Sequence, residues 1–151
     1  MKKNAYHYTF SGLNNIYLLN GYEIIHTEYG DTLSIQDVDG LHRMISDTLI
    51  NKPRRLLPAE YRFLRKEMKL SQVMLGQMLG VTDQTVARIE KGDTEASVPY
   101  EATFRALANE IICKQRSEIT AIINEINVRN DAKNHDLLLK IDNNKWERKA
   151  V

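Results

Sequence analysis

The sequence predicts an α+β protein in which a small β-rich region plus one helix precedes a mainly helical domain. Three observations support this fold class. The first fifty residues favour strands, because their alternating runs are rich in aromatic and β-branched types. Farther along, apolar residues recur every three or four positions, which predicts helices. Near the C-terminus, polar residues 142–144 separate two short runs, 137–141 and 145–149, and predict a β-hairpin.

The alternating runs in the first part predict four strands, at residues 6–10, 16–19, 22–27 and 33–35. Asn20-Gly21 separates the second and third runs. Both residue types tolerate a positive φ, so we expect a two-residue hairpin turn there. Gly30-Asp31 predicts the next turn, and the fourth strand is expected at a sheet edge. Helical spacing of the apolar residues then predicts an amphipathic helix over residues 38–51.

Composition limits the classes of protein that fit. The 151 residues are 42% apolar and 27% charged, with a formal net charge of +1, which is enough apolar material for a core. No run approaches the roughly 18 apolar residues of a membrane span, and we expect no signal segment. The single cysteine, Cys113, excludes an internal disulfide and a cysteine-based zinc cluster, and it fits a reducing, cytoplasmic compartment.

The near-zero net charge hides a basic stretch. Residues 52–69 contain seven Lys or Arg residues and only two Glu residues, a local charge of +5. Such a stretch is typical of a surface that faces phosphates, and it is also compatible with an ordinary solvated helix face.

Start and stop signals predict three consecutive helices after Pro58. The first covers residues 58–69. Ser71 is placed to cap a second helix that ends at Gly80, and Thr82 to cap a third helix, residues 83–91, that stops at Gly92. Two short helices joined by a tight glycine-containing turn form the helix-turn-helix layout, whose second helix enters the major groove of DNA.

Residues 70–92, LSQVMLGQMLGVTDQTVARIEKG, resemble the helix-turn-helix of the phage-repressor-like (Xre) family over their whole length. The resemblance implies that Gln72 touches backbone phosphate and that Arg88 and Glu90 help to hold the fold. It also implies that four residues approach the DNA: Thr82, Gln84, Thr85 and Arg88. A Gln84 amide suits adenine N6 and N7, and Arg88 suits guanine or a phosphate. The candidate DNA-binding residues are Lys69, Ser71, Gln72, Thr82, Asp83, Gln84, Thr85, Arg88 and Lys91. The spacing of Val81, Val86 and Ile89 predicts core positions.

The front half carries a second resemblance. Residues 6–21, YHYTFSGLNNIYLLNG, followed by Gly40-Leu-His and Arg62-Phe-Leu-Arg65, resemble the MqsA/YgiT-type (HigA-like) antitoxins. In those proteins a small N-terminal domain precedes the same helix-turn-helix and works with a ribonuclease toxin. Together the two resemblances cover roughly residues 6–110.

The chain departs from these antitoxins at their zinc site. The family carries CxxC pairs after the hairpin, whereas this sequence reads HTEYGD at residues 26–31. His26 without thiolates does not make a tetrahedral zinc site, so the sequence predicts no zinc or other cofactor. We expect five aromatic residues to hold the β core instead: Tyr6, Tyr8, Phe10, Tyr17 and Tyr22.

Two helical patterns, at residues 99–116 and onward to about 130, are predicted to complete the helical bundle. The repressor resemblance implies that they also form a homodimer contact, which would space two recognition helices about 34 Å apart on a palindromic operator. Trp146 is placed to pack on Leu138 across the C-terminal hairpin. An isolated hairpin is marginal in water, so we expect it to dock on the N-terminal sheet or a partner chain.

The sequence therefore predicts a β-rich domain at residues 1–52, a linker at 53–57, a DNA-binding and dimerisation domain at 58–130, and a hairpin tail at 131–151. The expected function is an autoregulating, DNA-binding repressor that neutralises a ribonuclease toxin by direct binding. A stand-alone or phage-borne regulator is the alternative. We expect no enzyme, because the four histidines are scattered and no catalytic motif is present. His42 is predicted to be a satisfied histidine at an interface, and a pure protein adaptor would not depend on Gln84 or Arg88.

Overall fold

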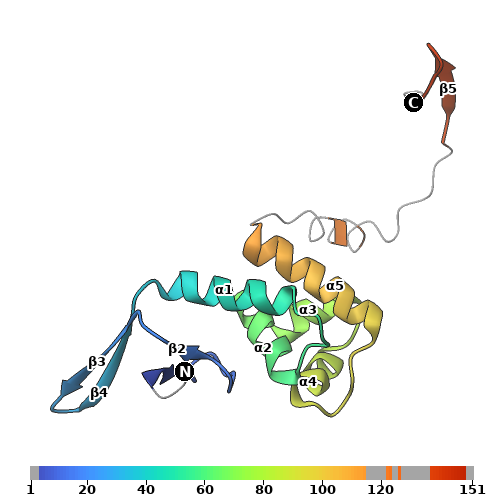
Figure 1. Cartoon of the computed structure of the whole chain (residues 1–151). Coiled ribbons are helices and arrows are strands. Elements are labelled where there is room, and N and C mark those ends of the chain that lie inside the picture. The colour runs from blue at the N-terminus through green and yellow to red at the C-terminus, as the bar shows by residue number, and fades with distance from the viewer. Residues whose placement is uncertain (1–3, 115–121, 124–125, 127–136, 149–151) are drawn as a thin grey trace.

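The computed structural model describes residues 4–114, 122–123, 126 and 137–148. This part of the chain contains three separate two-stranded antiparallel sheets and a group of helices, which confirms the predicted α+β class. Figure 1 shows two of the sheets at one end, next to helix α1, and the remaining helices packed beyond it. The third sheet lies in the C-terminal tail.

The N-terminal strands pair differently from the prediction. Strand β1 (Tyr6–His7) pairs with β2 (Tyr17–Leu18), and β3 (Tyr22–Thr27) pairs with β4 (Gly30–Ile35). Asn20-Gly21 therefore links two hairpins and is not itself a hairpin turn. The reason is register: Tyr22 lies opposite Ile35, and the Gln36 N–H donates to the Gly21 carbonyl at 2.8 Å, so Gly21 lies at the open end of the β3–β4 hairpin.

The predicted aromatic β core is only partly present. Tyr8 is buried, together with Leu13 and Leu18, and the rings of Tyr6 and Tyr22 lie 5.2 Å apart. The prediction was wrong for two residues: Phe10 is 78% exposed and Tyr17 is 37% exposed. Each two-stranded sheet is too small to cover both of its faces, which leaves these rings on the surface.

Helix α1 (Val38–Ile50) confirms the predicted amphipathic helix. The Asp37 carboxylate caps it by accepting from the Gly40 N–H at 3.1 Å. Its buried face carries Ile45, Leu49 and Ile50 toward the other helices. The helical spacing therefore predicts this face at Ile45, Leu49 and Ile50, but it also predicts Met44 there, and Met44 is 65% exposed.

A chain of hydrogen bonds connects β1, α1 and the next helix. The side chain of His42 lies between the Tyr8 hydroxyl, 2.7 Å from Nε2, and a Glu67 carboxylate oxygen, 2.6 Å from Nδ1. A carboxylate oxygen accepts, so His42 Nδ1 donates to Glu67, and Nε2 pairs with the Tyr8 hydroxyl. His42 is thus a half-buried residue with both ring nitrogens paired, as expected for a satisfied interface histidine.

The helical domain is built from α2 (Pro58–Glu67), α3 (Gln72–Leu79), α4 (Asp83–Lys91), α5 (Val98–Ala108) and the π-helical segment η2 (Asn109–Cys113). Its core is fully covered: Leu64, Leu75, Val86, Phe104 and Leu107 are at most 1% exposed. Helix α5 begins one residue earlier than predicted, because Ser97 accepts from the Tyr100 N–H at 3.2 Å and caps it. The helix predicted to run on to about residue 130 lies largely outside the described residues.

The stretch predicted as a linker is held against α5. The Arg105 guanidinium donates to the carbonyls of Ile50, Lys52 and Arg54 at 3.2, 2.6 and 2.5 Å, and Leu56 is buried. The C-terminal end of α1 and the start of α2 are therefore tied to one side chain. The division into two domains stays a prediction.

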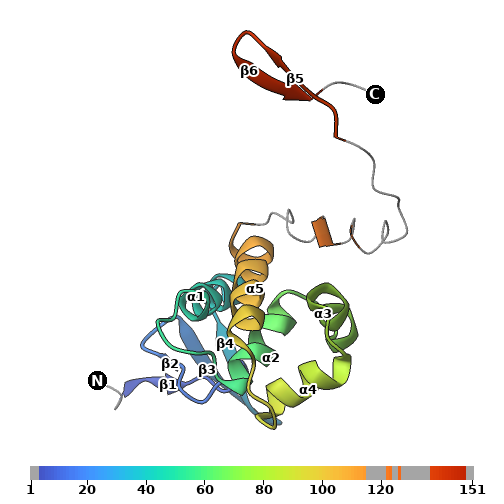
Figure 2. The same cartoon turned by 90° about the vertical axis from the view of Figure 1, so that its right-hand side faces the viewer.

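The C-terminal hairpin is confirmed. Strand β5 (Leu139–Asp142) pairs with β6 (Lys145–Arg148), and both turn residues, Asn143 and Asn144, have positive φ values of 49° and 62°. Trp146 lies opposite Ile141, and not next to Leu138 as predicted. All eight strand residues are exposed, and Figures 1 and 2 show the hairpin apart from the N-terminal sheets.

Candidate DNA-binding surface

Local signals fix the geometry of the pair α3–α4. Ser71 Oγ accepts from the Met74 N–H at 3.0 Å, and Thr82 Oγ1 accepts from the Thr85 N–H at 3.2 Å, so both predicted caps are formed. Gly80 ends α3 with φ +70°. A Cβ at Gly76 would lie 2.7 Å from the Val81 carbonyl oxygen, so only glycine allows α4 to approach α3 this closely.

Helix α4 has one buried face and one open face. Val86 and Ile89 are buried in the core, as their spacing predicts. Gln84 and Arg88 are exposed on the open face. Within the described chain these two side chains have no hydrogen-bonding partner, so their donors are available to an external ligand. Figure 2 shows α3 and α4 side by side at the edge of the helical domain, away from β1 and β2.

A buried ion pair fixes α4 against α2. Arg65 donates from Nε and Nη2 to the two Glu90 carboxylate oxygens at 2.5 and 3.2 Å, and from Nη1 to the Leu70 carbonyl at 2.9 Å. A two-pronged Arg–carboxylate pair sets orientation as well as distance. Glu90 therefore holds the fold, as the family resemblance implies, but its partner is Arg65 and not the neighbouring Arg88. Local sequence patterns do not indicate this partner, because Arg65 and Glu90 are 25 positions apart.

The structure brings the candidate residues to the α3–α4 pair and the turn before it. Seven are exposed: Lys69, Ser71, Thr82, Asp83, Gln84, Arg88 and Lys91. Thr85 and Gln72 are half-buried, and the Gln72 amide donates to Glu90 at 3.0 Å. Gln72 is thus held by the same carboxylate that orients α4.

Lys69 has an unusual backbone conformation. It joins α2 to α3 with a φ of +58°, in the left-handed region that most side chains avoid. Its side chain is exposed. The turn thus keeps a cation at a position where glycine would be less strained.

The basic stretch at residues 52–69 is partly neutralised within the fold. Three of its cations bind carboxylates of the same chain: Lys52 binds Glu60 at 2.6 Å, Arg55 binds Glu101 at 2.9 Å, and Arg65 binds Glu90. The stretch is therefore not a single phosphate-facing surface. Four cations are left on its outside, namely Arg54, Arg62, Lys66 and Lys69.

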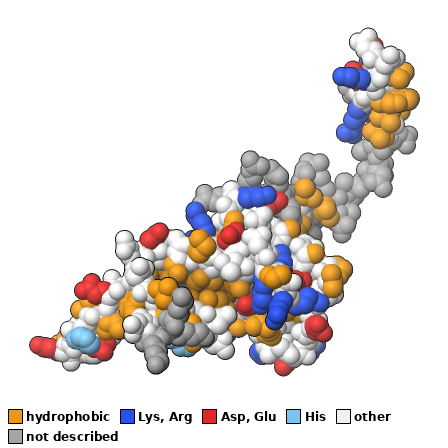
Figure 3. Space-filling model, in the orientation of Figure 1, with side chains coloured by type: hydrophobic (Ala, Val, Ile, Leu, Met, Phe, Trp, Pro, Cys, Tyr) orange, Lys and Arg blue, Asp and Glu red, His pale blue; other side chains and the backbone are white. Residues whose placement is uncertain are grey.

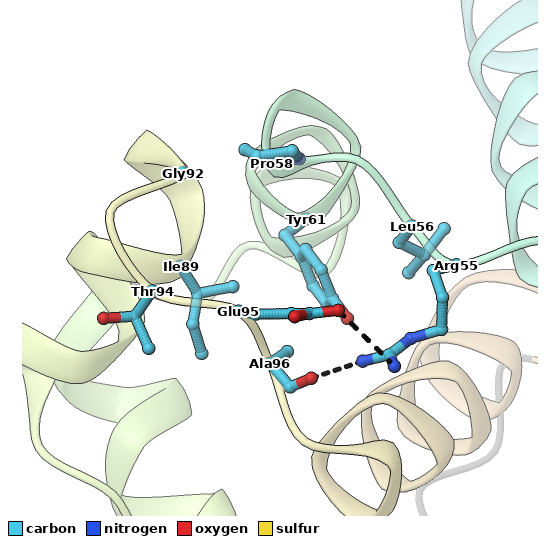
Figure 4. A pocket seen from close by; sticks show the side chains of 9 residues that line it. All are labelled: Arg55, Leu56, Pro58, Tyr61, Ile89, Gly92, Thr94, Glu95 and Ala96. Atoms are coloured by element: carbon cyan, nitrogen blue, oxygen red, sulfur yellow. Dashed lines mark hydrogen bonds and ion pairs between the residues drawn. The ribbon is translucent and has the colours of Figure 1, made fainter.

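The loop after α4 is also anchored. Figure 4 shows Arg55 reaching the Ala96 carbonyl and the Glu95 carboxylate beside a small hollow of about 200 Å³ next to Tyr61. The hollow is small, and both polar and apolar residues line it. We therefore interpret it as a gap left where the loop packs on the helices, and not as a ligand site. The contacts fix the path of the chain from α4 to α5.

The Glu101 carboxylate accepts hydrogen bonds from four residues in this region. Its Oε1 accepts from the Tyr61 hydroxyl at 2.7 Å, the Arg55 Nε–H at 2.9 Å and the Leu56 N–H at 3.1 Å, and its Oε2 accepts from Arg105 at 2.9 Å. Burial acts to raise the pKa of Glu101, but these donors outweigh it and lower the pKa to about 2. Burial and the nearby carboxylate raise the pKa of Tyr61. Glu101 is therefore an ionised structural residue that sequence reasoning missed.

Residues 62–100 match the model of the helix-turn-helix family. The chain contains a helix-turn-helix DNA-binding domain. It therefore carries the DNA-binding part of a transcription regulator, and the phage-repressor-like prediction is confirmed for this domain. No curated protein and no solved structure matches the chain.

Two further findings concern other kinds of site. Among the described residues, no group of three or more His, Cys, Asp and Glu side chains could hold a metal, and His26 pairs only with Asp31, at 2.6 Å on the surface. This donor set does not fit the zinc of the MqsA-type proteins. No helix in the described part of the chain is long and apolar enough to cross a membrane.

Proposed function

We propose that this protein is a sequence-specific transcriptional repressor that reads its own promoter through α4 and acts as the antitoxin of a toxin–antitoxin pair. The observation that carries the first half is the open face of α4. It presents the side chains of Gln84 and Arg88, which have no hydrogen-bonding partner among the described residues, while Val86 and Ile89 fix the opposite face in the core. A recognition helix needs this division, because base edges are read by free donors on a rigid element.

The roles divide between specificity and affinity. Gln84, Thr85 and Arg88 contact base edges, with Thr82 and Asp83 beside them at the start of α4. Lys69, Ser71, Gln72 and Lys91 contact the sugar–phosphate backbone. The exposed N-terminal N–H groups of α3 and α4 add donors that favour phosphate.

The repressor acts as a homodimer on a palindromic operator. Two half-sites one DNA turn apart supply the affinity that a single helix-turn-helix lacks. Ile122 and Ile126, which are 59% and 62% exposed, support a contact between copies because they lie four residues apart and leave apolar surface uncovered.

The toxin half of the proposal is supported by the resemblance of residues 6–21 to the MqsA-type antitoxins and by the apolar surface of the N-terminal region. Phe10, Leu19 and Tyr29 are 78%, 71% and 97% exposed. Large apolar side chains left this exposed favour a protein contact in the region. The N-terminal region binds the ribonuclease toxin and blocks it, and the chain itself has no catalytic role.

The DNA half is tested by fluorescence anisotropy on the duplex just upstream of the gene, with a scrambled duplex as the control. Wild type should prefer the upstream duplex, and Gln84→Ala/Arg88→Ala should lose that preference. Gln84→Ala alone should cost about 1–3 kcal/mol of binding free energy at one base pair. Equal binding of both duplexes by wild type and variant would refute the DNA half.

Lys69→Ala provides the matched test of phosphate contact. It should weaken binding to both duplexes alike and lower the slope of log K against log salt by about one. A loss confined to the upstream duplex would assign Lys69 to base reading instead.

The toxin half is tested with the protein encoded by the reading frame next to the gene. Co-expression of the full chain should restore growth to cells that express this neighbour, and the two proteins should form a complex. If no toxin-sized reading frame is present, or the neighbour is harmless, the chain is a stand-alone regulator.

A further inference from the structure

Charge is divided sharply along the chain. Residues 4–42 contain five carboxylates and no Lys or Arg, a net charge of −5, whereas residues 43–114 contain twelve Lys or Arg residues and nine carboxylates. All five carboxylates are exposed: Glu23, Glu28, Asp31, Asp37 and Asp39. Figure 3 shows the same division, with acidic and hydrophobic side chains over the β3–β4 end and Lys and Arg gathered over the helical domain.

The acidic region also contains an apolar groove. It has a volume of about 640 Å³ and runs along β4, between that strand, the segment that follows β1 and the start of α1. The groove is lined by Tyr8, Phe10, Asp31, Thr32, Leu33, Ser34, Ile35 and Val38. Its one ionisable carboxylate is Asp31, and no cation lines it. Phe10 and Val38 leave 78% and 44% of their surfaces exposed there.

The acidic side chains and the apolar groove together favour a basic protein over nucleic acid as the partner of this region. The β3–β4 hairpin carries three exposed carboxylates and no Lys or Arg, and such a surface repels nucleic acid, whose phosphates bind where Lys and Arg gather. The same face attracts a protein surface that is itself built to hold nucleic acid, because such a surface is basic. The apolar groove adds the buried anchor that a stable protein contact requires.

We propose that the β4 groove and the carboxylates around it are the docking surface for the basic, RNA-binding face of the toxin. An apolar side chain of the toxin occupies the groove beside Phe10 and Val38, while its Lys and Arg residues meet Glu23 and Asp31. The antitoxin thereby covers the toxin's RNA-binding surface. This inference rests on the proposed antitoxin function and identifies the surface that performs it.

The test measures the affinity of the full-length chain for the protein encoded next to its gene, by calorimetry at two salt concentrations. Glu23→Lys/Asp31→Lys should weaken the complex at least tenfold at low salt and reduce its salt dependence. Phe10→Ala should weaken it by a similar factor with unchanged salt dependence, because an apolar anchor is lost. Phe10 is mostly exposed, so its replacement leaves the fold intact.

Matched controls keep the result specific to this face. Asp47→Lys/Asp93→Lys makes the same change in net charge at two exposed positions of residues 43–114, and Val98→Ala removes apolar surface from the exposed start of α5. Neither should alter toxin affinity. Affinity of the face variants for the upstream DNA should also remain at the wild-type level, since Glu23, Asp31 and Phe10 lie outside α3 and α4.

Three outcomes overturn the inference, and they are distinguishable. If the neighbour binds wild type and the face variants equally, the toxin docks elsewhere and the antitoxin function stands. If the neighbour does not bind wild type, the antitoxin function fails together with its docking surface. If light scattering shows that the face variants change the mass of the chain alone, the groove is occupied by a second copy.

Discussion

Residues 4–42 and residues 43–114 differ in their secondary structure and in how many apolar side chains they bury. The first region has small two-stranded sheets, buries little beyond Tyr8, Leu13 and Leu18, and leaves large apolar side chains on its surface. The second buries Leu64, Phe104 and Leu107 completely and adds ion pairs in which the carboxylates are almost fully covered. The buried core and ion pairs of the helical domain therefore fix the orientation of α4. In the N-terminal region, by contrast, most side chains are exposed.

Glu101→Ala should cause the largest loss of stability. The change leaves the Arg105 guanidinium, the Tyr61 hydroxyl and the Leu56 N–H without their shared acceptor, and removing one partner of a buried pair costs about 3–5 kcal/mol. Urea unfolding measures the free energy. Glu28→Ala, an exposed carboxylate on the N-terminal hairpin, should change it by less than about 0.5 kcal/mol. Equal effects of the two substitutions would contradict the contrast between the regions.

Acid should destabilise the helical domain through the same residue. The pKa of Glu101 is about 2 in the folded chain and 4.5 in its ordinary state, so ionised Glu101 stabilises the fold above pH 4.5. That contribution, about 3 kcal/mol, is lost as the pH falls from 4.5 to 2. Unfolding free energies of wild type and Glu101→Gln across this window provide the measurement. The variant should lack this component, and parallel curves would show that Glu101 is not the titrating group.

Tyr8→Phe should loosen the N-terminal region alone. It removes the hydrogen bond to His42, whose usual net value is about 1 kcal/mol, and leaves the ring in place. Hydrogen exchange should accelerate in β1 and β2 and remain at the wild-type rate in α3 and α4. Faster exchange throughout the helical domain would mean that the two regions unfold as one unit.

Lys69→Gly should have the smallest effect, and its sign should be stabilising. Glycine adopts φ +58° without the strain that Lys69 bears, for a gain of about 0.5–1 kcal/mol. Lys69→Ala is the matched control, because it removes the same cation and keeps the strain. Thermal unfolding should separate the two variants, whereas DNA affinity should fall equally in both. A less stable Lys69→Gly would show that the turn is not strained.

Features encoded locally were predicted well from the sequence. Ser71, Thr82, Gly80 and Pro58 start or stop their helices as expected, because caps and helix breakers act within one turn. The open face of α4 followed from the spacing of Val86 and Ile89. The hairpin at residues 139–148 followed from its polar turn.

Features decided by distant residues were not predicted. Asn20-Gly21 has the composition of a hairpin turn, but β3 finds its partner in β4, which leaves that dipeptide between two hairpins. The charge of residues 52–69 was read as surface because its partners Glu90 and Glu101 lie 25 to 46 residues away from Arg65 and Arg55. A count of local charge contains no information about such pairs.

The most direct measurement is hydrogen exchange of the full-length chain with and without the upstream duplex. The proposed account predicts protection confined to the turn before α3 and to α3–α4, residues 69–91, with residues 4–35 unchanged. The variant Gln84→Ala/Arg88→Ala should lose that protection at the same duplex concentration. Protection over residues 4–35, or none over α4, would contradict the assignment of DNA reading to the helical domain and of partner binding to the N-terminal region.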